Sequence, residues 1–288
     1  MHSLEEAFDL AQRLLSLFND VSAAGLDSSP GGIPFAPDDP SQPYDIIESI
    51  IRPVFDAGSF LEFHRESGDP MSGSHLVTGL ARLEGRTVGV IADQPLFKGG
   101  GADAPGTEKF RIFTEMLNRR GIPLVMLSNS SGFVPGSTQE RFRIQAIGAE
   151  SLDANILGEI PVVSIVLNQN YGGRLIQAFN RFLRPGIVYL ARESAVMAVL
   201  GVTAAFDILY GKKHRQLLDE GKKERADELR EGFYRQYLDK ARASRDAVST
   251  GVIDWLIDDI RQLREHIVKG LRLAFRRCNE AFGTDWPQ

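Results

Sequence analysis

The chain has 288 residues, a formal net charge of −5 and 25% charged residues, which is typical of a folded protein long enough to bury a large core. The negative balance argues against non-specific binding to nucleic acid. A single cysteine, Cys278, excludes an internal disulfide and favours a reducing compartment, so we expect a cytoplasmic protein in which this thiol is structural.

The N-terminal region is predicted to form one helix and a linker. Apolar residues spaced three and four apart predict an amphipathic helix over residues 4–21. Residues 24–43 are rich in Gly, Pro, Ser and Asp, which is typical of an extended or mobile connection. We therefore expect an N-terminal helix and flexible linker over 1–42, and one compact domain over 43–288.

The compact domain begins with a short helix and a hairpin and continues as alternating helices and strands. Such alternation predicts an α/β fold with a largely parallel sheet. Helices are expected at 43–51, 107–120, 137–157, from about 172, and at 259–281, and strands at 60–63, 75–83, 87–92, 123–127, 161–167, 187–190 and 252–257.

The region after residue 190 differs in composition from the rest of the chain. Residues 195–210 form the longest apolar stretch, and it is too short and too interrupted to span a membrane, so we expect it to be buried core. Residues 212–245 are very polar and predict a solvated helical hairpin.

Two glycine-containing junctions each follow an apolar β-branched run and precede a helical pattern. They are Ser-Gly-Phe-Val-Pro-Gly at 131–136 and Asn-Tyr-Gly-Gly-Arg at 170–174. Glycines at strand-to-helix turns leave main-chain N–H groups exposed where an anion is favoured. Both turns are therefore predicted to direct amides at one developing oxyanion.

In the order and spacing of its motifs, including the two glycine-containing junctions, the chain resembles the C-terminal half of the carboxyltransferase component of biotin-dependent acyl-CoA carboxylases and decarboxylases. The resemblance covers about residues 43–275 and is carried by residues 44–46, 77–82, 121–125, 131–136, 171–173 and 251–254. It implies the ClpP/crotonase-like fold, an α/β spiral of ββα units with flanking helices.

The resemblance also implies the roles of particular residues. The backbone N–H groups of Gly173 and Arg174 would bind the ureido oxygen of biotin, with Gly132 and Phe133 forming the facing wall. The rest of the biotin and substrate pocket would be lined by Tyr171, Gly172, Ile176, Pro135 and Gly136.

The cofactor would be biotin on a separate carrier protein, and the substrate a CoA thioester. Relatives usually have two crotonase-like domains, so the resemblance implies a partner half or subunit that binds the acyl-CoA. It also implies an oligomer. No metal, nucleic acid or membrane span is expected.

The sequence departs from the family pattern at two places. Relatives usually have a small residue where this chain has Arg174, whose side chain would either fill the biotin pocket or bind a carboxylate or phosphate of another substrate. Residues 194–201 lack the glutamate of the usual Met-Gly-small-Glu-Gly turn. Asp93 and Glu140 are the carboxylates best placed to reach a cleft, and the glycines at 99–101 form either a phosphate cradle or a flexible loop.

Three functions remain open on these grounds. The first is the biotin-side subunit of an acyl-CoA carboxyltransferase. The second is a biotin-independent crotonase-like decarboxylase, hydratase or hydrolase acting on a CoA or carrier-protein thioester, which Arg174 and the missing glutamate favour. The third is a non-catalytic scaffold subunit, since fold alone does not fix function.

Overall fold

The computed structural model describes residues 4–19, 28–40, 42–63, 73–243 and 245–286. Within them, one mixed sheet has the order β1-β2-β3-β4-β5-β6-β8, and β7 pairs with β5. The first three strands are antiparallel and the remaining pairs are parallel. The strands are β1 Leu61–Phe63, β2 Leu76–Leu83, β3 Arg86–Asp93, β4 Leu124–Ser130, β5 Val162–Tyr171, β6 Ile187–Arg192, β7 Val196–Ala198 and β8 Trp255–Ile257.

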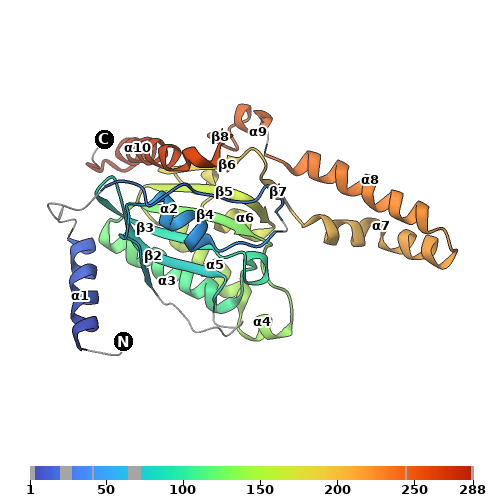
Figure 1. Ribbon diagram of the computed structural model, residues 1–288, viewed down its shortest axis with the longest axis horizontal. Coiled ribbons are helices and arrows are strands. Elements are labelled where there is room, and N and C mark those ends of the chain that lie inside the picture. Colours follow the sequence, from blue (N-terminus) through green and yellow to red (C-terminus); the bar gives the residue numbers. More distant parts are fainter. Residues whose placement is uncertain (1–3, 20–27, 41, 64–72, 244, 287–288) are drawn as a thin grey trace.

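Helices cover both faces of this sheet, with α3 and α5 on one side and α10 on the other (Figure 1). The α-helices are α1 Leu4–Phe18, α2 Arg52–Val54, α3 Ala104–Arg120, α4 Ser137–Arg141, α5 Ile144–Ile156, α6 Gly173–Gln177, α7 Val202–Asp219, α8 Lys223–Ala241, α9 Arg245–Ser249 and α10 Leu263–Phe282. Short π- or 3₁₀-helical segments occur at Ile47–Ile51, Lys98–Gly100, Arg181–Leu183 and Ile260–Gln262.

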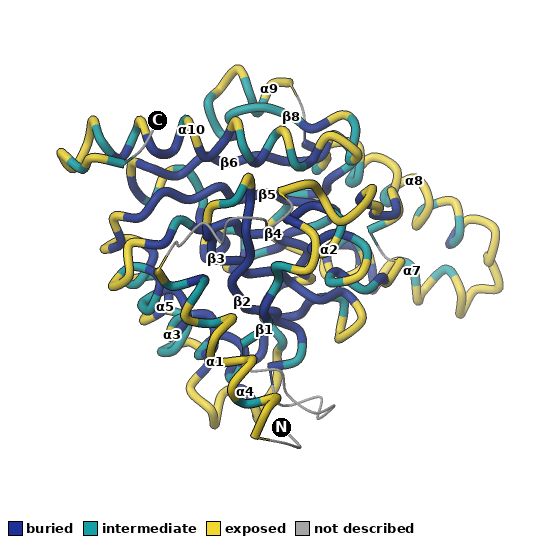
Figure 2. The backbone as a smooth tube through the Cα atoms, turned by 60° about the vertical axis from the view of Figure 1, so that its left-hand side comes forward, coloured by how far each residue is buried: buried dark blue, intermediate teal, exposed yellow. Residues whose placement is uncertain are grey.

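The central strands are buried on both faces, as Figure 2 shows. Val163 of β5 lies in a core with Ile267 of α10, whereas Val162 lies in a second core with Phe110 of α3. This two-residue period, apolar on both faces, is what a parallel sheet between helical layers requires. The sequence pattern therefore predicted this part of the fold.

Several predicted elements differ from the observed ones in extent. β4 and β5 continue to Ser130 and Tyr171, past the end of their apolar runs. The helix predicted at 137–157 is broken into α4 and α5, because Arg143 between them has φ 58°, a left-handed conformation that a helix cannot contain.

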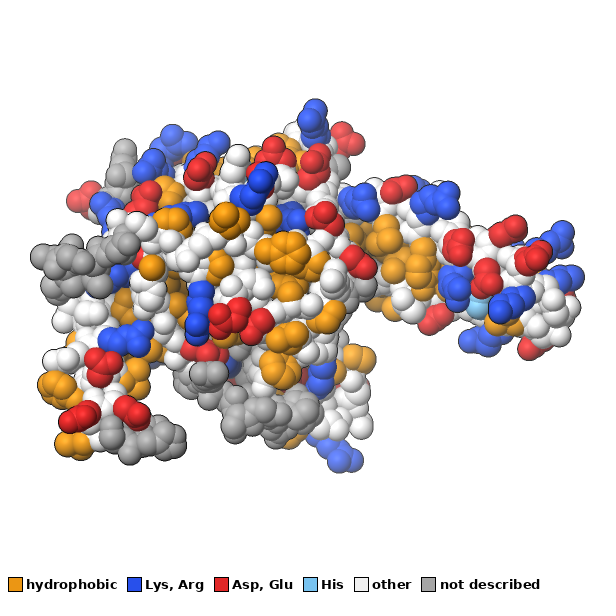
Figure 3. Space-filling model, in the orientation of Figure 1, with side chains coloured by type: hydrophobic (Ala, Val, Ile, Leu, Met, Phe, Trp, Pro, Cys, Tyr) orange, Lys and Arg blue, Asp and Glu red, His pale blue; other side chains and the backbone are white. Residues whose placement is uncertain are grey.

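The apolar stretch at 195–210 is buried only in part: Ala195 and Phe206 are buried as predicted, but for the other half of the stretch the prediction was wrong. Ile208 is 71% exposed, Leu209 65% and Val199 81%. α7 and α8 pack on each other as an arm that projects from the body, so only the facing stripe of each helix is covered. Figure 3 shows hydrophobic side chains gathered on this arm near the body. The helical hairpin itself was predicted correctly.

The described part of the linker, residues 28–40, is held on the compact domain. The main-chain N–H of Phe35 donates to Ser49 O at 2.9 Å, and Arg192 donates to Pro37 O at 3.1 Å. Ala36 and Pro37 are buried, although the composition predicted little burial here. Residues 20–27 and 41 lie outside the described residues, and the division between 42 and 43 stays a prediction.

In the described ranges, no helix is both long and apolar enough to cross a membrane. This finding agrees with the interruptions that Gly201, Thr203 and Asp207 make in the apolar stretch of the chain. The exposed aliphatic residues of α7, Ile208, Leu209 and Leu218, lie on the surface of the arm.

Cys278 is fully buried on α10, and burial raises the pKa of its thiol to about 11 from a reference of 9.0, although Arg184 opposes the shift. The two-unit difference makes the thiolate fraction of the folded chain about a hundredfold smaller near pH 8. We expect iodoacetamide to alkylate the native protein at least about a hundredfold more slowly than the urea-unfolded chain.

The same shift predicts how stability depends on pH. Because the folded-state pKa is raised, the contribution of the protonated thiol is fully present below the pKa of the unfolded chain and is lost as pH rises from about 9 to 11. A Cys278→Ala variant should lose this component of the alkaline decline in urea midpoint. Rapid alkylation of the native chain at pH 8 would contradict the assignment of a buried, protonated thiol.

Candidate functional site

Two glycine-containing turns leave the sheet at the same edge. We call residues 131–136, after β4, the first turn, and residues 170–174, at the end of β5, the second turn. β4 and β5 are parallel neighbours, and Ser130 is paired with Asn170. Because the carboxyl ends of adjacent parallel strands meet at one edge, the two turns begin side by side.

The two turns are also in close contact with each other. A side-chain carbon on Gly132 would lie 3.3 Å from Tyr171 O, and one on Gly173 would lie 3.1 Å from the Phe133 ring. Gly132 has φ 99° and Gly172 has φ 61°, conformations that L side chains rarely adopt. Glycine is therefore required here both for the backbone and for the approach of the turns.

The main-chain N–H groups of the turns are only partly used within the chain. Gly172 N–H donates to Ala198 O of β7 at 3.0 Å, and Gly132 N–H donates to Ser130 Oγ at 3.2 Å. Among the described residues, the N–H groups of Phe133, Gly173 and Arg174 make no hydrogen bond. Gly173 is exposed and Arg174 is buried, so one of the two consecutive unused donors at the start of α6 lies at the surface and the other directly beneath it.

The other predicted site residues, around the start of α6, differ in how far they are exposed to solvent. Pro135 and Gly136 are exposed, and Ile176 is 48% exposed on α6. Tyr171 is buried, and burial raises the pKa of its hydroxyl to about 12, so this tyrosine is uncharged near neutral pH. The chemistry that the turns offer is thus hydrogen-bond donation by main-chain groups, beside an apolar and partly open surface.

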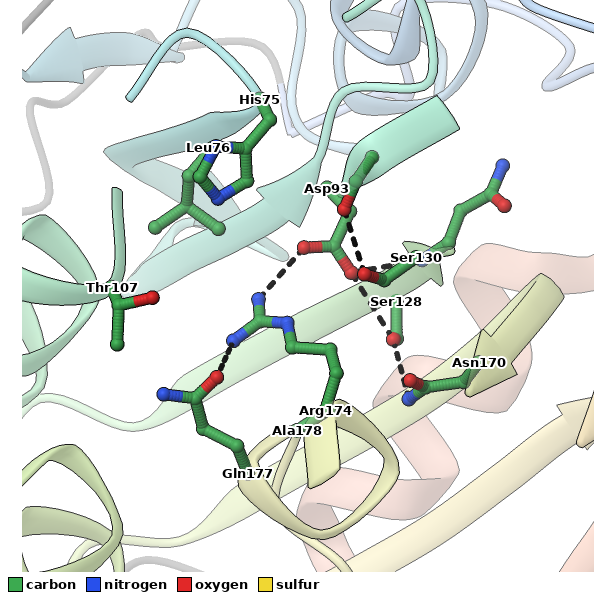
Figure 4. Close-up of polar contacts among 12 residues, drawn as sticks. His75, Leu76, Asp93, Thr107, Ser128, Ser130, Asn170, Arg174, Gln177 and Ala178 are labelled. Atoms are coloured by element: carbon green, nitrogen blue, oxygen red, sulfur yellow. Dashed lines mark hydrogen bonds and ion pairs between the residues drawn. The ribbon is translucent and has the colours of Figure 1, made fainter. Parts of the chain in front are cut away.

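The Arg174 side chain points away from that surface, into the protein. It is 1% exposed, and its guanidinium donates to Asp93 Oδ1 at 2.7 Å and to Gln177 Oε1 at 2.6 Å (Figure 4). It also lies 4.9 Å from the centroid of the Phe110 ring. Both expectations for this side chain, filling the pocket or binding a ligand anion, were therefore wrong, because the guanidinium is committed to a buried carboxylate.

Asp93 is a structural carboxylate rather than one that reaches a cleft. Besides Arg174 it accepts hydrogen bonds from Ser128 Oγ at 3.2 Å and from Asn129 N–H at 3.0 Å. Asn170 Nδ2 in turn donates to Ser128 Oγ at 2.8 Å. One buried group thus ties the ends of β3, β4 and β5 to α6, and the sequence reasoning missed this link.

Glu140, the other carboxylate singled out, lies on α4 and is exposed. It makes no hydrogen bond or ion pair through its side chain within the described residues, and only its backbone takes part in helix capping. Its position is that of a surface residue near the first turn.

The glycines at 99–101 are a support for the first turn. A side-chain carbon on Gly100 would lie 2.0 Å from Asn129 O, so this residue must be glycine for packing reasons. Three successive carbonyls, of Lys98, Gly99 and Gly100, accept hydrogen bonds from Ser131 Oγ, Ser131 N–H and Ser130 Oγ. The segment is therefore neither a phosphate cradle nor a free loop.

The segment that lacks the family glutamate is held by other groups. β7 pairs in parallel with the last residues of β5, so the carbonyl of Ala198 accepts a hydrogen bond from Gly172 N–H. Leu200 O accepts a hydrogen bond from Tyr237 Oη of α8 at 2.7 Å. The second turn is thus supported from the base of the arm. In the described chain, no group of three or more potential metal ligands comes together.

Breaking the buried pair should cost far more stability than breaking an exposed one. Arg174→Met leaves the Asp93 carboxylate buried without its cation, for an expected loss of about 3–5 kcal/mol in unfolding free energy. Arg119→Met, which removes an exposed pair with Glu115 on α3, should cost less than about 1 kcal/mol. Urea unfolding followed by circular dichroism measures both, and equal losses would contradict a structural role for the buried pair.

Comparison with known proteins agrees with this architecture. The family model described as carboxyl transferase domain matches residues 12–283. The propionyl-CoA carboxylase beta chain of Saccharopolyspora erythraea is 32% identical over 82% of this chain and 42% of its own length. The methylmalonyl-CoA carboxyltransferase 12S subunit of Propionibacterium freudenreichii subsp. shermanii is 33% identical over 74% of this chain and 40% of its own length.

A solved structure of the transcarboxylase 12S protein, described as a hexamer assembly with methylmalonyl-coenzyme A bound, superposes with a TM-score of 0.72. Its identity is 28%, and the match covers 92% of this chain and 47% of that one. The predicted α/β, crotonase-like fold is thereby confirmed. The chain spans less than half the length of each of these relatives. The chain belongs to the carboxyl transferase domain family.

Proposed function

We propose that this chain is the biotin-side subunit of an acyl-CoA carboxyltransferase. The observation that carries the proposal is the pair of unused N–H groups at the start of α6, those of exposed Gly173 and of Arg174 directly after it. These donors suit an oxygen that gains negative charge. The resemblance to the carboxylase family assigns that oxygen to the ureido group of biotin, which when bound supplies a transferable carboxyl group.

In this proposal the protein acts by placing donors in advance. Gly173 lies against the Phe133 ring and the preceding Gly172 is hydrogen-bonded to Ala198 of β7, so the Gly173 N–H does not have to reorient as charge develops. Gly132 and Phe133 form the facing wall, and Tyr171, Gly172, Pro135 and Gly136 line the approach. No side-chain acid or base of this chain is needed at the ureido oxygen.

A partner is proposed to complete the site. Gly173, Pro135 and Ile176 are exposed, so the site opens onto the surface. The match covers 42% of the propionyl-CoA carboxylase beta chain, and we propose that a second domain, corresponding to the rest of that relative, binds the acyl-CoA. Exposed Ile176 and the exposed apolar residues of α7 provide a surface for an apolar neighbour.

The wider assignment follows the same reasoning. We propose that biotin arrives on a carrier protein, that the substrate is a CoA thioester held by the partner half, and that the assembly is oligomeric. The single buried cysteine favours the cytoplasm. Arg174 would favour biotin-independent chemistry only if its side chain could bind a substrate anion, and it would favour a scaffold only if its side chain folded into the turn. The side chain is instead buried against Asp93, so Arg174 supports neither alternative.

Ligand binding and reconstitution test this function. We expect biotin to perturb the second turn in heteronuclear NMR spectra of the purified chain, whereas a short acyl-CoA should not. When the chain is mixed with a separately produced N-terminal half of a related beta chain, we expect the complex to decarboxylate a malonyl-type CoA thioester in a biotin-dependent manner. Turnover by the isolated chain that avidin leaves unchanged would instead support the biotin-independent alternative.

The donor role of Gly173 is tested by a pair of variants. Gly173→Ala and Gly173→Pro both add a carbon that meets the Phe133 ring at 3.1 Å, but only proline removes the N–H. The residue opens α6, a position that tolerates proline. We expect Gly173→Pro to lower kcat about 10²- to 10³-fold relative to Gly173→Ala in the reconstituted reaction. Equal activities of the two variants would exclude this amide as a donor.

A further inference from the structure

A cavity of about 480 Å³ lies at the edge of the sheet opposite to the two turns. It is formed where β3 and β4 begin, between the end of α1, the β2–β3 turn, the α3–β4 turn, α10 and the C-terminal segment. In Figure 1 this is the side of α1 and the C-terminus, away from the α7/α8 arm. We call it the amino-edge cavity. The function proposed above does not use it.

About half of the lining of the amino-edge cavity is apolar. Leu17 of α1, Val88 of β3, Ile122, and Leu271 and Phe275 of α10 line it, and each is at most 9% exposed. Side chains from four separate elements therefore converge on one space. The volume lies in the range of small-molecule sites, which combine apolar surface with a few polar groups.

An aromatic side chain closes one end of this space in a fixed position. The Trp286 ring stacks on Phe275, with ring centroids 5.8 Å apart. Its main chain is held by Asn279, which accepts from Trp286 N–H at 2.8 Å and donates to Trp286 O at 2.9 Å. The wall is thus built by specific contacts before any ligand is present.

The charged residues of the amino-edge cavity are mostly cationic. Arg86, Arg120 and Arg272 line it, against one carboxylate, Glu84. Arg272 lies 3.7 Å from Glu84, and Arg120 is stacked 5.0 Å from the centroid of the Phe18 ring. The three arginines outnumber the single carboxylate, which leaves a net charge of +2 at the cavity. A guanidinium group is well suited to bind a carboxylate.

We propose that the amino-edge cavity binds a small amphipathic carboxylate, meaning an unbranched apolar chain that ends in a carboxyl group. The aliphatic part of the ligand lies against Leu271, Phe275 and Trp286, and its carboxylate lies at Arg86 and Arg120. The arginines disfavour an amphipathic cation, and a neutral chain would leave them without an anion. The site is independent of the carboxyltransferase assignment, since it is lined by other residues at the opposite edge.

Fatty-acid titration of the full chain tests this proposal. The reporter is Trp286 fluorescence in a Trp255→Phe background, because Trp255 of β8 does not line the cavity. We expect octanoate to bind saturably with one site per chain by calorimetry. Affinity should rise about three- to fourfold per methylene from butanoate to octanoate. Octylamine and octanol should bind at least about fivefold more weakly than octanoate.

Variants separate the head-group contact from the chain contact. Arg86→Gln and Arg120→Gln are each expected to weaken octanoate about two- to fivefold while leaving octanol unchanged. Val268 of α10 also lines the cavity, so Val268→Phe reduces the space and should weaken both ligands. Arg119→Gln is the matched control, because Arg119 neighbours Arg120 on α3 but pairs with Glu115 and is not part of the lining.

Three results would overturn the proposal. These are binding of octanol as tight as that of octanoate, an equal loss in Arg119→Gln and Arg120→Gln, and octanoate affinity that does not depend on chain length. The arginine variants alter exposed side chains, so circular dichroism should show an unchanged fold. If Val268→Phe unfolds, the arginine pair and the chain-length series still decide the outcome.

Discussion

The buried ion pair between Arg174 and Asp93 determines which way the second turn faces. A charge at this depth is stable only beside its counter-ion, so the guanidinium is fixed beneath the sheet edge. The backbone at the start of α6 is thereby held at the sheet edge, where Gly173 is exposed and the N–H groups of Gly173 and Arg174 have no acceptor among the described residues. A long cationic side chain next to paired glycines is compatible with an open turn for this reason.

The two edges of the sheet differ in their chemistry. At the carboxyl ends of β4 and β5, glycines bring main-chain groups together and the side chains beneath them are occupied with one another. At the other edge, the contributing segments are far apart in sequence, from α1 to Trp286, and side chains form both the walls and the rim. Main-chain donors at the carboxyl edge suit a charge that develops during reaction. Arginine side chains at the amino edge suit a ligand that already carries a negative charge.

Local patterns predicted most of the elements and the adjacency of the two turns. Pro123 and Pro161 mark the starts of β4 and β5, and their carbonyls accept the first hydrogen bonds from neighbouring strands. The destination of Arg174 was not predictable in this way, because its partner Asp93 is 81 residues away and is brought close only by the sheet. Ile208 was predicted to be buried and is exposed, for a different reason. An apolar sequence shows that burial of a segment would be favourable, but it does not show whether the same chain or another molecule buries it.

The projecting arm has a consequence for how the protein accumulates in a cell. Ile208 and Leu209 sit on a helix that touches mainly its own hairpin partner, so their hydrocarbon remains wetted in the solitary chain. Surfaces of this kind promote self-association and recognition by chaperones. A chain whose arm is left uncovered is therefore the species most prone to self-association and to chaperone binding.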